Sequence, residues 1–211
     1  MKFVFISIVC YLIPLSVANI IADIISKEYD NLLPPKSNDE PVLVNITLSL
    51  LNLRSVKAQD LTFTVDLFVH QYWTDNRLTY PSSDVKENSV TLHSSWSNKL
   101  WIPDIYFKNG ISGEISAQQF KTTYFILHSN KTIFMASRVT VQLVCDMDFT
   151  QYPHDSHLCS IKVTSLSDQR STVELDWSDF IMSKRLHHTD YLIEFVSKDR
   201  CDKSYVIVLR L

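Results

Sequence analysis

Three long stretches that alternate between apolar and polar side chains constrain the fold more than any other feature of this sequence. They cover residues 42–54, 60–73 and 132–145. Successive side chains of a β-strand point to opposite faces of a sheet, so a period of two predicts strands with one buried and one solvent-facing side. Further strands are predicted at 121–128, 158–166, 171–177, 190–197 and 204–210. Many strands separated by short breaks predict an all-β sandwich or barrel.

The parity of each long strand divides its side chains between core and surface. The predicted core positions are Val42, Val44, Ile46, Leu48, Leu50, Phe63, Val65, Leu67, Val69, Trp73, Ile133, Met135, Val139, Val141 and Leu143. The predicted outward positions are Asn45, Thr47, Ser49, Thr62, Thr64, Asp66, Phe68, His70, Tyr72, Ala136, Arg138, Thr140 and Gln142. Ahead of these strands, residues 23–33 show weak helical periodicity and end at Pro34-Pro35, which predicts a short N-terminal helix.

The N-terminus has the pattern of a secretory signal peptide. Lys2 precedes an apolar stretch over 3–17, and Ser16-Val17-Ala18 is a small-x-small cleavage site. The apolar stretch is shorter than the roughly 20 residues of a membrane-spanning helix. We therefore predict a signal peptide over 1–18 and one mature domain over 19–211. The sequons at Asn45 and Asn130 are predicted glycosylation sites that agree with the secretory pathway.

Composition and residue patterns argue against several classes of function. The chain has two glycines and a formal net charge of −3, which disfavours glycine-rich nucleotide folds and nucleic-acid binding. No nucleophile paired with a base and no phosphate loop is evident, so we predict that the chain is not an enzyme and needs no cofactor. His154 and His157 have the spacing of a metal-binding pair, but no third ligand stands nearby, and we predict no metal site. His187-His188 lies in a polar stretch and is predicted to be solvated surface.

The cysteines form an odd set once the signal peptide is removed. Cys10 lies in that peptide, which leaves Cys145, Cys159 and Cys201. An odd count in a secreted chain indicates a partner outside the chain or a free thiol. With thirteen residues between them, Cys145 and Cys159 are the natural pair, and Cys201 is predicted to stay unpaired.

The segment between the paired cysteines carries a specific motif. It reads Cys-Asp-Met-Asp-Phe-Thr-Gln-Tyr-Pro-His-Asp-Ser-His-Leu-Cys over 145–159. It resembles the signature loop of the Cys-loop pentameric ligand-gated ion channels, and Met147-Asp148 resembles the anion-channel branch gated by glycine, GABA or glutamate. Residues 68–78 and Trp101-Ile102-Pro103-Asp104 resemble two further motifs of that family, and Trp177 falls at an expected tryptophan. The resemblance runs from about residue 23 to about residue 203.

This resemblance implies an all-β, immunoglobulin-like sandwich of about ten strands. Such a domain is extracellular, assembles as a ring of five homologous subunits and binds a small-molecule or ionic agonist between neighbours. The loop residues Asp148, Tyr152, Pro153 and Asp155 would then rest on the membrane domain and pass the binding signal to a pore that conducts chloride. Trp73, Trp101, Pro103 and Asp104 would be structural. The ligand-contacting positions implied by the resemblance are Phe68, His70, Tyr106, Ala136 and Leu166.

Three of these positions depart from the pattern of amino-acid-gated members. His70 stands where an arginine grips a carboxylate, Ala136 where a small hydroxyl residue is usual, and Leu166 where an aromatic residue is usual. We therefore expect either an accessory subunit that contributes only one complete side of an intersubunit ligand site, or an unusual ligand. An interface histidine can change charge near neutral pH, so a response to protons or to a transition metal through His70 is one hypothesis; simple packing of His70 is the other.

The end of the chain bears on where the protein resides. Cys201 resembles the first cysteine of an extra disulfide in glycine- and glutamate-gated chloride channels, but the second cysteine, expected about ten residues later, does not occur before Leu211. No apolar stretch long enough for a pore helix follows the signal peptide. We expect a truncated isoform or an incomplete gene model, located at the plasma membrane when full-length and secreted or held in the secretory pathway otherwise. The alternatives are a soluble pentameric binding protein and a dominant-negative subunit without channel activity. An unrelated adhesion sandwich is disfavoured by the motifs.

Overall fold

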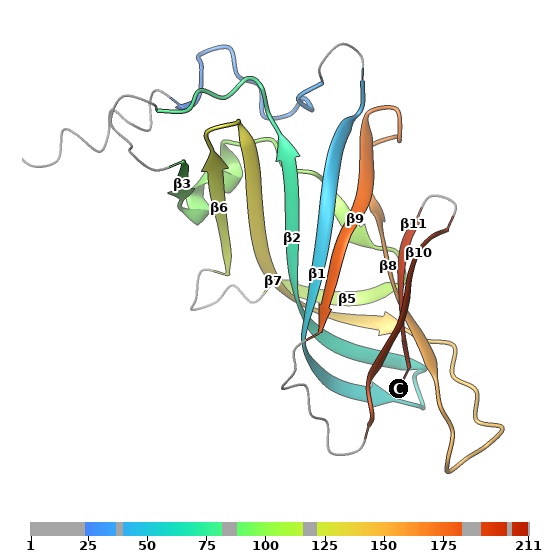
Figure 1. Ribbon diagram of the computed structural model, residues 1–211. Helices are drawn as coiled ribbons and strands as arrows, with labels where there is room; N and C mark the ends of the chain where they lie inside the picture. Colours follow the sequence, from blue (N-terminus) through green and yellow to red (C-terminus); the bar gives the residue numbers. More distant parts are fainter. Residues whose placement is uncertain are drawn as a thin grey trace, which may run out of the picture.

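The computed structural model describes residues 24–36, 40–81, 88–115, 122–182, 191–201 and 204–210, without the side chains of 114–115 and of 200 onward. The predicted signal peptide and His187-His188 lie outside this part. The described residues form eleven strands and one short 3-10 helix (Figure 1). These are β1 (Val42–Lys57), β2 (Thr62–Thr74), β3 (Ser89–Leu92), η1 (Ser94–Asn98), β4 (Ile105–Phe107), β5 (Gly110–Ile115), β6 (Thr123–His128), β7 (Thr132–Val144), β8 (Leu158–Ser165), β9 (Val173–Met182), β10 (Glu194–Cys201) and β11 (Ser204–Arg210).

The strands form two sheets. The larger sheet has seven strands in the order β3-β6-β7-β2-β1-β9, with β5 also paired to β7. The smaller sheet has the order β10-β11-β8-β4. Every pair is antiparallel except β1 with β9, which run parallel. This arrangement confirms the predicted all-β sandwich.

A continuous apolar core lies between the sheets. It contains the inward-facing side chains of β1 and β2, including Ile46, Phe63 and Leu67, together with Ile161 and Val163 of β8. All five of these side chains are fully buried. Removing apolar area from water stabilises the fold by roughly 25 cal/mol per Å². All the core positions predicted from the alternating pattern are buried except Met135 and Val139, which are partly buried against the core.

Some positions predicted to face solvent are nevertheless buried. Thr47, Thr62, Asp66 and Ala136 lie on the outer face of the large sheet, but each is less than a tenth exposed. Their side chains are short, and longer side chains of adjacent strands cover them. Thr62, for example, accepts a hydrogen bond of 3.0 Å from Gln142 Nε2 on β7. The parity of a position predicts which face of the sheet its side chain lies on, but its exposed fraction depends on the neighbouring side chains.

The N-terminal segment differs from its predicted form. Of residues 24–33, only Ile24 is helical, and turns cover residues 27–28 and 31–32. Arg77 Nη1 donates to the carbonyl oxygens of Asp30 and Leu33, each at 2.9 Å, and so ties this segment to the turn that follows β2.

Candidate functional site

The outer face of β2 and β7 carries a row of aromatic side chains. Phe68 and His70 stack with ring centroids 5.9 Å apart, and the His70 and Phe134 centroids lie 5.5 Å apart. Phe134 also contacts Tyr72 and Tyr124, at 4.7 Å and 5.9 Å. We call these five residues the outer aromatic face. It lies opposite the core side of the same strands, and Tyr72 and Tyr124 are 36% and 42% exposed.

His70 is a neutral member of this face at neutral pH. Burial between aromatic neighbours lowers its pKa from the ordinary 6.5 of histidine. Its strand partners are Thr47 on β1 and Ala136 on β7. Ala136 is only 1% exposed, because its methyl group lies between the longer side chains of His70 and Tyr124, which pair with it from either side. The structure thus brings Phe68, His70 and Ala136 together on one surface.

An ionic cluster adjoins the outer aromatic face, and the sequence analysis did not recognise it. Asp66 is 2% exposed and accepts hydrogen bonds from Arg54 Nε at 2.8 Å and from Thr140 Oγ1 at 2.6 Å. Arg138 Nη2 lies 3.8 Å from Asp66 Oδ2. The three strands β1, β2 and β7 each supply part of this cluster. The outward parity shared by Asp66, Arg138 and Thr140 was the available signal.

Tyr106 and Leu166, the other two predicted ligand contacts, lie at the β4 edge of the smaller sheet. Tyr106 pairs with Thr164 of β8 and is 38% exposed, whereas Leu166 follows β8 and is 70% exposed. Tyr106 also lines a hollow of about 370 Å³ with Ile111 and Val141. These two residues therefore lie on a different sheet from Phe68 and His70.

Asp104 fixes the turn that carries Leu166. The Leu166 amide donates to the Asp104 carbonyl oxygen at 2.9 Å, and Ser165 Oγ and the Ser167 amide donate to the Asp104 carboxylate at 2.7 Å and 2.6 Å. Burial opposes ionisation of this carboxyl, but the hydrogen bonds from Ser167 and Ser165 outweigh it and lower the pKa of Asp104. Burial of Asp168 itself, together with the charge of Asp104, raises the pKa of Asp168.

The Cys145–Cys159 disulfide is present and closes a loop that projects from the sandwich. The two Cα atoms are 4.9 Å apart, and both cysteines are buried. In contrast, the loop tip is exposed, with Tyr152 at 77% and Phe149 at 41%. Asp148 accepts a hydrogen bond of 3.0 Å from the Thr150 amide, which lowers the pKa of its carboxyl. The side chain of Cys201 lies outside the described part.

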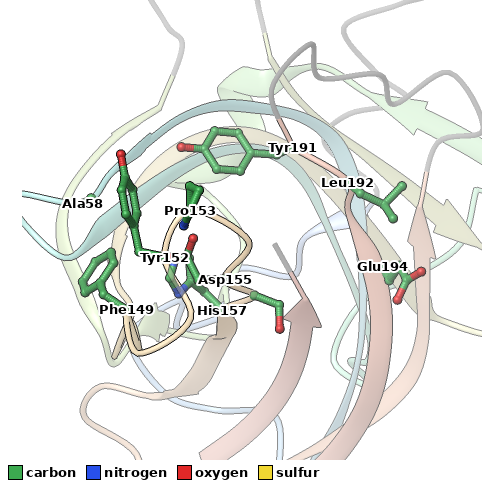
Figure 2. Close-up of a pocket in the computed structure, with 10 residues that line it drawn as sticks. Ala58, Phe149, Tyr152, Pro153, Asp155, His157, Tyr191, Leu192 and Glu194 are labelled. Carbon is green, nitrogen blue, oxygen red and sulfur yellow. The ribbon is translucent and has the colours of Figure 1, made fainter.

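A hollow of about 490 Å³ lies behind this loop. Figure 2 shows Phe149 and Tyr152 on one side and Leu192 and Glu194 on the other, with Asp155 and His157 between them. His157 Nε2 lies 3.0 Å from Asp155 Oδ2, and the ring is almost fully buried. Among the described residues, no three metal-ligating side chains lie close enough together to hold a metal ion, and this includes the surroundings of His154 and His157.

Two of the predicted structural residues, Trp73 and Trp101, meet in the core. Trp73 and Trp101 pack edge to face with centroids 6.2 Å apart, and the Trp101 amide donates to Tyr29 Oη at 2.9 Å. Tyr29 Oη in turn donates to Asp75 Oδ2, also at 2.9 Å. Burial is the main cause that raises the pKa of Tyr29 to about 12. Pro103, two residues after Trp101 in the sequence, is also buried.

The two sequons lie at the same end of the large sheet. Asn130 is exposed in the β6–β7 turn, where its Oδ1 accepts from the Thr132 amide at 3.1 Å and Lys131 takes a φ of 64°. Asn45 is half-buried on the outer face, opposite Tyr72. Glycosylation at both positions remains a prediction.

Comparison with known proteins agrees with this geometry. Residues 17–206 match the family described as the neurotransmitter-gated ion-channel ligand binding domain. The chain is 28% identical over 172 residues to the gamma-aminobutyric acid receptor subunit theta of Mus musculus, covering 82% of this chain and 26% of that protein. It is also 28% identical over 160 residues to the rho-3 subunit of Homo sapiens, covering 72% of this chain and 34% of that protein.

The chain belongs to the neurotransmitter-gated ion-channel ligand-binding domain family, which comprises receptors and not enzymes. The predicted resemblance to the Cys-loop channels and to their anion-channel branch is thereby confirmed. The chain spans about a third or less of the length of the relatives described above. Among its described residues, no helix is both long and apolar enough to cross a membrane.

Proposed function

We propose that this chain is one subunit in a ring of five and that it contributes residues to agonist sites formed with its neighbours. The observation that carries the proposal is the separation of the predicted ligand contacts. Phe68 and His70 lie on the outer face of the large sheet, whereas Tyr106 and Leu166 lie at an edge of the smaller sheet. Because a core separates the two sheets, one chain does not bring both groups into one pocket. Two neighbouring copies can do so, each supplying one group.

The exposed loop between the cysteines supports a role in coupling to a membrane domain. Its tip presents Tyr152 and Phe149 to solvent, while the disulfide and buried His157 hold its base. An exposed apolar tip on a rigid base suits contact with another domain. We infer that Asp148, Tyr152, Pro153 and Asp155 make this contact in the full-length protein, on the extracellular side of the plasma membrane. The resemblance of Met147-Asp148 to the anion-channel branch supports chloride as the ion.

The names of the relatives support a small molecule as the agonist, since both are receptors for γ-aminobutyric acid. Protonation of His70 is a second possible input. Its lowered pKa means that the ring is neutral above the ordinary value of 6.5 and gains a proton only in more acidic solution, at a cost to the packed face. A proton response through His70 would therefore appear on acidification below pH 6.5.

A chimaeric receptor tests the proposal. Residues 1–210 are joined to the membrane domain of the human rho-3 relative and expressed in oocytes, and currents are recorded with γ-aminobutyrate, glycine, glutamate, simple amines, acid and zinc. We expect at least one of these to evoke a current that Phe68→Ala abolishes. Leu32→Ala, which truncates a side chain that is 82% exposed, is the matched control and should leave the current unchanged. Surface receptors that native mass spectrometry shows not to be pentameric would contradict the proposal.

A further inference from the structure

The side chain of Asn109 bridges the two sheets next to the disulfide. Its Nδ2 donates to the carbonyl oxygen of Val144 at the end of β7 and to that of Ser160 in β8, at 2.9 Å and 2.8 Å. Its Oδ1 accepts from the amide of Lys162 at 3.1 Å. Val144 and Ser160 directly adjoin the two disulfide-bonded cysteines. One amide side chain therefore joins the two strands from which the loop between the cysteines projects.

This bridge requires an amide at position 109. An asparagine side chain has two N–H donors and a carbonyl oxygen that accepts, whereas an ionised aspartate can only accept. Both donors of Asn109 are used on main-chain carbonyl oxygens. A carboxylate in the same place would face those oxygens without a proton to share.

The next residue is glycine, and the close packing there favours glycine. A Cβ atom at Gly110 would lie 3.0 Å from the carbonyl oxygen of Phe107, which is tighter than nearly all Cβ contacts. Because that oxygen belongs to the backbone, it cannot swing aside as a flexible side chain could. Asn109-Gly110 is the only Asn-Gly pair in the sequence, and the fold favours each member for a separate reason.

Asn-Gly is also the residue pair most prone to deamidation. The backbone nitrogen of the glycine attacks the side-chain carbonyl carbon of the asparagine and forms a new C–N bond. The bond from that carbon to Nδ2 breaks, and ammonia leaves with the proton of the glycine nitrogen. Water then opens the succinimide ring to aspartate or isoaspartate, so water is the only other reactant. Glycine favours ring closure because it has no Cβ to obstruct the approach.

We propose that Asn109 is a deamidation site that the native fold protects, so that only chains that spend time unfolded become modified there. In the folded chain, three hydrogen bonds hold the Asn109 amide, and Gly110 is paired opposite Leu143 between β5 and β7. Ring closure requires these hydrogen bonds to break first. After deamidation, the carbonyl oxygens of Val144 and Ser160 lose their donor, so the modified chain cannot rebuild the bridge.

Peptide mapping by mass spectrometry, with chromatography that separates aspartate from isoaspartate, tests the protection. The mature secreted chain, with its disulfide intact, is held at one mildly alkaline pH in native buffer or in guanidinium chloride. We expect Asn109 to deamidate at least about tenfold more slowly in native buffer, because the hydrogen bonds of its amide must break first. Asn88, which is exposed and precedes Ser89, is the internal control and should deamidate at similar rates in both conditions. Equal rates for Asn109 in the two conditions, or no deamidation of the unfolded chain at Asn109, would overturn the proposal.

The variant Asn109→Asp, which carries one of the two products, tests the loss of the bridge. We expect its equilibrium constant for folding, measured by urea unfolding, to fall about tenfold or more, because two main-chain carbonyl oxygens lose a donor. A variant too unstable to measure would show the same effect as a reduced amount of secreted protein. Asn88→Asp is the matched control and should resemble the unmodified chain in both measurements. If Asn109→Asp equals Asn88→Asp in stability and in secreted amount, the bridge does not depend on the amide and this part of the proposal is wrong.

Discussion

Replacing Asp75 by asparagine should destabilise the domain strongly with almost no change in shape. The Asp75 carboxylate is fully buried and accepts hydrogen bonds from Tyr29 Oη and from the backbone N, Nε and Nη2 of Arg77, at 2.9–3.1 Å. Asp75→Asn removes the charge and turns one acceptor into a donor that faces other donors. Breaking a buried ion pair from one side costs about 3–5 kcal/mol. Because the Arg77 side chain is 28% exposed, we expect the lower end of that range.

Urea unfolding followed by tryptophan fluorescence measures this loss. With an m-value of about 2 kcal/mol/M, a destabilisation of about 3 kcal/mol moves the midpoint down by about 1.5 M. Asp60→Asn, which neutralises an exposed carboxylate in the β1–β2 turn, is the control and should stay within about 0.5 kcal/mol. The double variant with Arg77→Gln should lose less than the sum of the single variants, by at least about 1 kcal/mol. A small loss in Asp75→Asn, or strict additivity, would refute this account of the cluster.

Three further predictions concern stability and local order. Since the pKa of Tyr29 is raised to about 12, stability is complete below pH 10 and falls as the pH rises from 10 to 12; we expect a loss of about 1 kcal/mol after allowing for partial exposure, and Tyr29→Phe should remove this alkaline slope. Replacing both Cys145 and Cys159 by alanine should lower the free energy of unfolding by about 3 kcal/mol, and equal urea midpoints with and without the disulfide would disprove this. Asp104→Ala should speed hydrogen exchange at the Ser167 amide, which donates to the Asp104 carboxylate, while the Leu127 amide in β6 serves as an unaffected reference.

The sequence predicted the long strands because their core positions repeat over many residues. The observed β2 and β7 begin and end within two residues of the predicted stretches. The short strands β3, β4 and β5 were not predicted, since three to six residues offer too little periodicity and gain their place through pairing with β6, β8 and β7. The N-terminal helix over 23–33 was predicted from weak local periodicity, and among its described residues only Ile24 is helical.

For the candidate site, the motifs located each residue but not its surroundings. Parity predicted that Phe68, His70 and Ala136 face outward, and the strand pairing places His70 opposite Ala136 on that face. The burial of Asp66 and its contacts with Arg54, Arg138 and Thr140 were not foreseen, because they depend on how three strands meet. Relations across strands of this kind are set by side-chain packing, and no local pattern in the sequence encodes them.

The turn that Asp104 holds also has an evolutionary consequence. Its backbone is fixed by the carbonyl and carboxylate of Asp104, and the 70%-exposed side chain of Leu166 contributes nothing to that arrangement. A change of residue at position 166 therefore alters what this surface exposes without altering how the domain folds. Under the proposed function, in which Leu166 contacts the agonist, duplicated subunits of this type would be able to diverge in agonist preference through single substitutions at this position, without loss of stability.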